Sequence, residues 1–148
     1  MVICAFRSAI FLKAFMIFEL ENKLPKREPS AAQLRAGLLK LRSYGPSSYA
    51  SLTDDQGNYL QVGGGGLTCL FERRSASDGR HYRAYLAEPS LLHPDGTVLA
   101  FSAGEVSLRS DEWIPVSLVI PAFTAFLIGQ PLPEPIRWRD MTVLLNAQ

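Results

Sequence analysis

The sequence predicts a single α+β domain in which an antiparallel β-meander sheet packs against an N-terminal helix and C-terminal helices. Apolar residues recur at helical spacing between residues 31 and 41, alternate with a period of two from residue 49 to 108, and return to helical spacing beyond Asp111. The chain has 148 residues, 47% of them hydrophobic and 20% charged, which suffices for one packed core. We therefore expect one domain over residues 16–148.

Residues 1–15 are interpreted as an extension upstream of this domain. The stretch is apolar apart from Arg7 and Lys13, which gives it some likeness to a signal peptide. However, Lys13 falls inside the apolar stretch, and no small-residue cleavage site follows before Glu19. The stretch is also too short and too charged for a membrane span. We take Met16 as the natural start, because Met16 to Leu20 has the alternating character of an opening strand.

The clearest helix is predicted after a polar connector that ends at Pro29. Ser30 and Gln33 have the spacing of a capping box, in which each side chain accepts a hydrogen bond from the other residue's backbone. Gly45-Pro46 is expected to end the helix, since Gly accommodates a left-handed cap and Pro cannot continue the helix. The apolar residues of its inner face are Ala31, Leu34, Leu38 and Leu41.

The middle of the chain predicts the strands of the meander. Asp54-Asp55-Gln56-Gly57 has the composition of a hairpin turn between two alternating segments. His81, Arg83 and Tyr85 are expected to share one face of a later strand. The predicted strands are Tyr49–Thr53, Asn58–Val62, Leu67–Glu72, His81–Leu86, Val98–Phe101 and Glu105–Leu108.

Helical spacing returns from Ser117 to Gly129. Pro121 is compatible with a helix only near the first turn, where few amides are engaged, so the helix should begin close to Ser117. The prolines from Pro131 to Pro135 predict a stiff link. After it, Trp138 to Leu145 is expected to form a short last helix, with the indole of Trp138 anchored over the core.

The residues that could carry chemistry form no catalytic or metal-binding pattern in the sequence. Gly63 to Gly66 lacks the Lys-Ser/Thr and the helix that follow a phosphate loop, so a glycine-rich turn or bulge is predicted. Ser102 has only a partial likeness to a nucleophile elbow, because the first glycine is missing and a strand follows. His81 and His93 lack the spacing of zinc ligands. We expect no metal, no cofactor and no enzymatic activity.

Charge and cysteine content narrow the choice of partner and compartment. The net charge is +1 and the basic residues are scattered, with Arg73-Arg74 the densest pair. A nucleic-acid binder usually carries a basic excess or stripe, so no direct binding to nucleic acid is expected. Cys4 and Cys69 are too few for a disulfide framework, and Cys69 lies in an apolar run. A buried free thiol in a reducing compartment is predicted.

Two stretches near the C-terminus resemble a known family. The first is Gly104 to Trp113, followed by a helix that ends in Ala125-Phe126-Leu127-Ile128-Gly129, and the second is Pro133 to Met141. The Gly-Glu-Val strand, the amphipathic helix and the Pro-x-x-Ile-x-Trp pattern resemble immunity protein family one of bacterial polymorphic toxin systems. The two predicted strands Asn58 to Val62 and Leu67 to Glu72 also follow each other in the same order as strands of that family's middle sheet. The resemblance covers roughly residues 30–145.

The resemblance implies a function that composition alone does not. Such immunity proteins are α+β proteins of the producer's cytoplasm that bind and neutralise a cognate toxin domain, often a nucleic-acid deaminase or nuclease, and they are not enzymes. The near-neutral charge departs from the acidic character common where a toxin attacks polyanions. Two other hypotheses stay open, namely a small-molecule-binding domain with a pocket between sheet and helix, and a hydrolase that uses Ser102.

Candidate partner-binding residues come from turns and from strand positions that the alternation leaves outward. Carboxylates suit a toxin site that binds nucleic acid, and Tyr is frequent at binding hot spots. The alternative interpretation of each candidate is a solvated polar position. The candidates are Asp54, Asp55, Glu72, His81, Tyr85 and Asp95.

Overall fold

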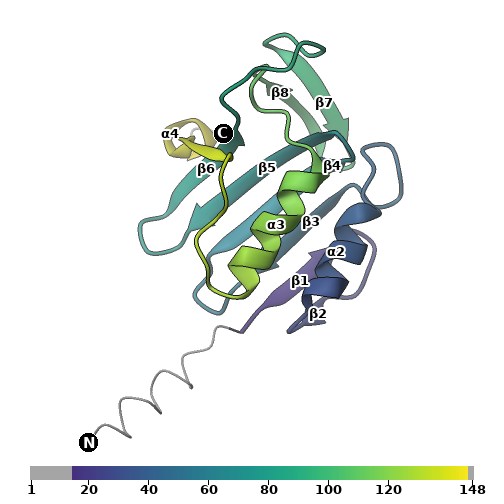
Figure 1. Ribbon diagram of the computed structural model, residues 1–148, viewed down its shortest axis with the longest axis vertical. Helices are drawn as coiled ribbons and strands as arrows, with labels where there is room; N and C mark the ends of the chain where they lie inside the picture. The colour runs from purple at the N-terminus through teal and green to yellow at the C-terminus, as the bar shows by residue number, and fades with distance from the viewer. Residues whose placement is uncertain (1–14, 147–148) are drawn as a thin grey trace, which may run out of the picture.

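An antiparallel sheet forms the centre of the protein in the computed structural model, which describes residues 15–146 (Figure 1). The strands are β1 (Ile17–Leu20), β2 (Lys26–Arg27), β3 (Tyr49–Thr53), β4 (Tyr59–Gly65), β5 (Thr68–Ser75), β6 (Arg80–Tyr85), β7 (Thr97–Phe101), β8 (Gly104–Leu108) and β9 (Arg137–Asp140), and the helices are α2 (Ala31–Leu39), α3 (Val116–Leu127) and α4 (Thr142–Asn146). The seven-stranded sheet has the order β2-β1-β3-β4-β5-β6-β9, and β7 and β8 form a separate hairpin. The predicted α+β class with an antiparallel sheet is confirmed.

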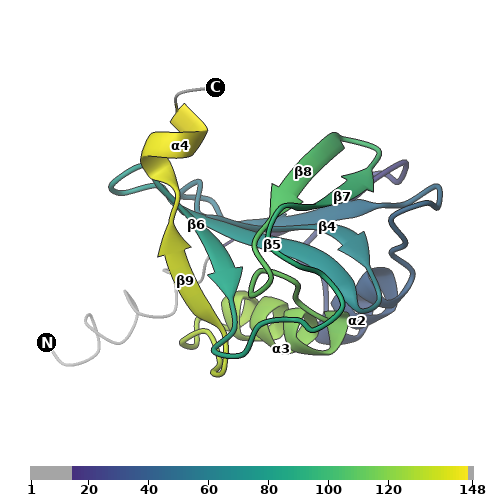
Figure 2. The same ribbon diagram turned by 90° about the horizontal axis from the view of Figure 1, so that it is seen from above.

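The two longer helices and the hairpin lie on opposite faces of the sheet. Figure 2 shows α2 and α3 below the sheet and the β7–β8 hairpin above it. Among residues 15–146 the longest helix, α3, has 12 residues, and no helix there is long and apolar enough to cross a membrane. Residues 1–14, on which the expected upstream extension falls, lie outside the described residues, as does Cys4.

The helix α2 begins as its sequence predicts and ends earlier. The Ser30 hydroxyl accepts a hydrogen bond from Gln33 N (3.1 Å), and the Gln33 side chain accepts one from Ser30 N (2.9 Å), which completes the capping box. The helix ends at Leu39, not at Gly45, with Lys40 as its C-cap. Beyond it Arg42 N donates to Ser47 O (3.0 Å), so the chain already turns toward β3.

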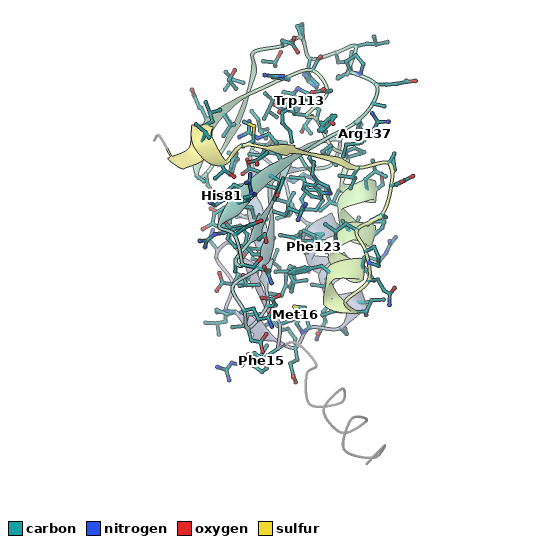
Figure 3. All side chains as sticks on the ribbon, turned by 90° about the vertical axis from the view of Figure 1, so that its left-hand side faces the viewer. Phe15, Met16, His81, Trp113, Phe123 and Arg137 are labelled. Atoms are coloured by element: carbon teal, nitrogen blue, oxygen red, sulfur yellow. The ribbon has the colours of Figure 1, made fainter. Side chains whose placement is uncertain are left out.

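The main core lies between the sheet and the two helices. The strand register places Leu20, Ala50, Val62 and Phe71 opposite one another across β1, β3, β4 and β5. Phe123 points from α3 toward the sheet (Figure 3) and stacks on Phe71 with ring centroids 5.9 Å apart. Ala50, Val62, Phe71 and Phe123 belong to one buried apolar cluster, against which the partly buried Leu20 packs, and this cluster holds the sheet to the helices.

The C-terminal segment differs from the sequence prediction. Arg137 to Asp140 is the edge strand β9 and only Thr142–Asn146 is helical, whereas a helix was expected from Trp138 to Leu145. The free edge of β6 has backbone donors and acceptors to satisfy, and β9 pairs with it from Tyr82 to Tyr85. The period of two then turns the Trp138 ring to the core, 5.3 Å from the Phe71 ring.

The sheet forks beyond Arg83, where residues 110–114, here called the wedge segment, enter between β5 and β6. Cys69 and Ile114 exchange two backbone hydrogen bonds of 3.0 Å on the β5 side. On the other side Leu86 N donates to Asp111 O (2.9 Å). The wedge segment therefore carries its side chains into the middle of the sheet.

Both edges of the sheet are short and charged. β2 has two residues, Lys26 and Arg27, and both are exposed. β9 has four residues, with Arg137 and Asp140 exposed.

Candidate partner-binding face

The candidate site is the sheet surface opposite α2 and α3, here called the open face. Strand register arranges its side chains in rows, because residues paired across antiparallel strands share a face. One row is Thr53, Tyr59, Arg74 and His81 on β3, β4, β5 and β6. The next row is Glu19, Ser51, Gln61, Glu72, Arg83 and Arg139 on β1, β3, β4, β5, β6 and β9.

The β7–β8 hairpin covers one end of the open face. The Phe101 ring lies over Gly63 so closely that a Cβ there would be 2.6 Å from the ring, so any other residue would displace the ring. Leu70 of β5 joins Leu99, Leu108 and Trp113 in a second, smaller core under the hairpin. A groove of about 360 Å³ remains between hairpin and sheet, bordered by Tyr49, Gln61, Leu70, Phe101 and Val106 among others.

A second cleft, of about 310 Å³, lies on the other face of the sheet, between β1 and α2. Its floor is apolar, with Phe18, Leu20 and Gly37, and Lys23 and Lys40 stand at its rim. The alternative hypothesis of a small-molecule-binding domain requires a pocket between sheet and helix, and this cleft lies there.

Ion pairs occupy the centre of the open face. Arg83 is buried, and its Nε donates to Glu72 Oε2 (2.9 Å) while its Nη1 lies 3.7 Å from Glu112 Oε1. The other Glu72 oxygen accepts a hydrogen bond from the exposed Gln61 amide (3.1 Å). Buried charges persist where they are paired and hydrogen-bonded, as these are.

Arg139 extends this network to the edge of the sheet. It donates to Glu112 Oε2 (2.7 Å) and to both Asp111 oxygens (3.0 and 3.3 Å), and the hydrogen bonds to Asp111 are the largest cause that raises the pKa of Arg139. Its guanidinium also lies 4.3 Å from the centroid of the Tyr85 ring. The ion network, defined as Glu72, Arg83, Asp111, Glu112 and Arg139, thus links β5, β6, β9 and the wedge segment.

Glu72 is less exposed than a partner-binding residue was expected to be. Alternation places it on the open face as expected, but its exposed fraction is only 8% because its carboxylate pairs with Arg83 beside the wedge segment. Tyr85 is half-buried beneath Arg139. His81 is half-buried and stands in the same row as the exposed Arg74, where its imidazole remains a candidate for contact with a partner.

The three aspartates occupy turns at opposite ends of the molecule. Asp54 accepts hydrogen bonds from Gln56 N, Asn58 N and Asn58 Nδ2, all 2.9 Å, and so holds the β3–β4 turn in which Asp55 is exposed. Asp95 precedes β7 at the other end, and its hydrogen bond from Ser110 N (2.7 Å) is the largest cause that lowers its pKa. The six predicted residues therefore do not form one continuous surface.

A small polar cluster fastens the tip of the hairpin to the sheet. Ser48 is fully buried, its hydroxyl lies 2.7 Å from Ser102 Oγ, and it donates to the Glu21 carboxylate (2.9 Å). Ser48 N donates to the same carboxylate oxygen (2.6 Å), and the Ser102 hydroxyl is the largest cause that lowers the pKa of Glu21. Ser102 therefore stands beside a carboxylate, and no histidine takes part in the hydrogen bonds of this cluster.

The remaining titratable residues show no assembled reactive centre in the described part of the chain. Between residues 15 and 146 no group of three or more His, Cys, Asp or Glu side chains could hold a metal ion. The predicted buried free thiol is confirmed for Cys69, whose pKa burial raises to about 12. A thiol with that pKa stays protonated and unreactive near neutral pH.

Sequence reasoning missed Asp111, Glu112 and Arg139 as members of the site. Asp111 and Glu112 lie in the irregular wedge segment, and Arg139 was expected on a helix. The signal that the sequence offered was that Glu72 and Arg83 fall on successive predicted strands, where cross-strand pairing can bring opposite charges together.

Comparisons of the chain with protein-family models, with curated proteins and with solved structures find no match. The resemblance to immunity proteins therefore remains a prediction from the short motifs of the sequence.

Proposed function

We propose that this protein binds a partner protein across the open face of its sheet and that, in line with the sequence resemblance, the partner is a cognate toxin that it neutralises in the cytoplasm. The observation that carries the proposal is a row of side chains on the open face, next to the row of Gln61 and Glu72, that α2 and α3 leave uncovered. It comprises Tyr59, Arg74 and His81, with the exposed Gln61 in the adjacent row. An aromatic ring, a guanidinium, an imidazole and an amide are groups that protein interfaces use.

The ion network supports this proposal because it fixes the surface before any partner arrives. Gln61 is held by Glu72, which in turn is held by Arg83. A surface whose side chains are already ordered loses less conformational entropy on binding. The open face carries charges of both signs, with Glu19 and Arg74 exposed, and this suits a near-neutral protein partner better than it suits mimicry of nucleic acid.

The test is binding to the toxin domain encoded beside this protein's gene, measured by calorimetry with purified proteins. The variants His81→Glu and Gln61→Arg alter the open face at positions that are not part of the core. Each is expected to weaken binding at least about tenfold, a difference of about 1.4 kcal/mol. Arg35→Glu, on the exposed side of α2, is the matched control and should leave affinity unchanged. Unchanged affinity in both open-face variants would place the interface elsewhere, and absence of any complex would refute the proposal.

The groove under the hairpin favours a second candidate, binding of a small apolar ligand. Tyr49, Phe101, Leu70 and Val106 provide apolar walls, and Gln61 provides a polar group, a composition typical of small-molecule sites. Phe101→Ala separates the two candidates. It should abolish binding of a small ligand in the groove, whereas a protein partner that rests on the row of Tyr59, Arg74 and His81 should lose little affinity.

A further inference from the structure

The guanidinium of Arg73 stands out among the charged groups of the protein. Its Nε is buried without a hydrogen-bond partner, and none of the ion pairs found among residues 15–146 includes Arg73. Burial is the largest cause that lowers its pKa. The half-buried guanidinium therefore has an Nε–H that has lost water without gaining a hydrogen bond, a cost that a bound anion would offset.

Aromatic rings hold Arg73 in place on the helix side of the sheet. Its guanidinium carbon lies 4.1 Å from the centroid of the Tyr82 ring and 5.1 Å from that of Trp138. Stacking on aromatic rings stabilises the cation while leaving the in-plane N–H groups free to donate. The side chain is therefore oriented, although no anion in the described chain orients it.

Arg73 borders a cleft of about 330 Å³ at the C-terminal end of α3. Met16, Phe126 and Leu132 form apolar walls, and Gln130, an exposed residue, also lines the cleft. Asp54 lines it too, but the three hydrogen bonds that its carboxylate accepts within the β3–β4 turn commit it there. The cleft thus offers the oriented Arg73 guanidinium beside apolar surface, and Arg74 and the committed Asp54 carboxylate also line it.

We propose that this cleft binds a carboxylate with an apolar body, and that the Arg73 guanidinium holds the carboxylate. A guanidinium matches the two oxygens of a carboxylate with two parallel N–H donors. The charges of Asp54 and Arg74, which both line the cleft, offset each other, so one negative charge on the ligand balances Arg73 and a carboxylate is preferred to a phosphate dianion. The site does not depend on the proposed function, because Arg73 projects from the face of the sheet opposite the open face.

The experiment is a titration of the full chain with benzoate, followed by the Nε–H resonance of Arg73 in proton–nitrogen NMR spectra and by Trp138 fluorescence. Benzamide is the neutral match and phenyl phosphate the dianionic one. We expect saturable benzoate binding with a Kd on the order of 1 mM, binding of phenyl phosphate that is no tighter, and no saturation with benzamide. N-acetylphenylalanine, compared with its amide, serves as the model of a peptide C-terminus. Tighter binding of that acid than of benzoate would identify a polypeptide end as the source of the carboxylate, and the reverse would identify a free acid.

Three variants complete the test. Arg73→Gln should abolish benzoate binding, and Arg73→Lys, which keeps the charge and loses the planar fork, should weaken it several-fold. Arg80→Gln removes a nearby charge that does not line the cleft and should leave the affinity unchanged. Saturation by benzamide equal to that by benzoate, or benzoate binding that survives Arg73→Gln, would overturn the proposal. So would a wild-type protein that benzoate does not saturate.

Discussion

Replacing Arg83 with methionine should be among the most destabilising single substitutions in this protein. The guanidinium is buried between two carboxylates, 2.9 Å from Glu72 and 3.7 Å from Glu112, and the Glu112 side chain is only 2% exposed. At an effective dielectric constant of about 20, the Coulomb attraction is about 6 kcal/mol at the first distance and about 4.5 kcal/mol at the second. Desolvation of the three groups offsets most of that attraction in the native protein.

The substitution removes the attraction and leaves the desolvation of the carboxylates in place. We therefore expect Arg83→Met to lower the free energy of unfolding by about 3–5 kcal/mol, which corresponds to a fall in Tm of roughly 10 °C. Urea denaturation followed by tryptophan fluorescence measures the free energy, and a thermal melt measures the Tm. Arg80→Met is the control, because Arg80 forms its ion pairs with Asp78 and Asp140 in exposed positions and should alter stability little.

A double variant separates the charge effect from a simple loss of packing. Adding Glu72→Met to Arg83→Met removes one stranded carboxylate, and Glu112 keeps its hydrogen bonds from Arg139 and from the backbone of Arg109. The double variant should therefore be more stable than Arg83→Met, by at least about 1 kcal/mol. A single variant that loses less than about 1 kcal/mol, or a double variant less stable than the single one, would refute this account of the ion network.

Three further predictions concern the C-terminal anchor, the N-terminal segment and one acidic side chain. Trp138→Ala should lower the free energy of unfolding by about 3 kcal/mol, because the ring packs against Phe71; an unchanged melt would contradict this. A chain that begins at Met16 should have the circular dichroism spectrum and Tm of the full chain, because the buried core of the described residues begins at Met16. Loss of soluble protein would show that residues 1–15 contribute to the fold. Asp140 should titrate with a pKa of about 2, chiefly because Thr142 donates hydrogen bonds to it and also because Arg80 lies beside it. Its contribution to stability should therefore be complete above the unfolded pKa of about 4 and should be lost as the pH falls through about 2. Carbon NMR of the carboxyl group measures this midpoint, which Thr142→Val should raise.

Local chemistry made part of the fold predictable. The capping box at Ser30 and the β3 strand from Tyr49 to Thr53 depend on residues close in sequence, and both were predicted correctly. The prediction of a helix from Trp138 to Leu145 was wrong because Arg137 to Asp140 forms a strand by pairing with β6, which is distant in sequence. Local patterns thus predicted the helix N-cap and the β3–β4 turn, and strand pairing between residues far apart in sequence was not predictable from them.

The site was less predictable than the fold for a related reason. Alternation identified which face of β5 carries Glu72, but it could not show that the wedge segment brings Glu112 to the other side of Arg83. A carboxylate expected at the surface is therefore buried. Asp54 was predicted as a partner-binding residue in the hairpin turn, and the three hydrogen bonds that its carboxylate accepts there arise from the geometry of the hairpin.

The short, charged edges of the sheet have a consequence for self-association. A sheet edge with free backbone groups is a template on which a second chain can add its own strand, and long flat edges promote fibres. Among residues 15–146, the seven-stranded sheet offers a second copy the two residues of β2, both cationic and exposed, or the four residues of β9. At β2 like charges would repel each other, and β9 is too short to provide many backbone hydrogen bonds. The seven-stranded sheet should therefore resist edge-to-edge polymerisation at high concentration, and partners should approach the flat of the sheet instead of extending it.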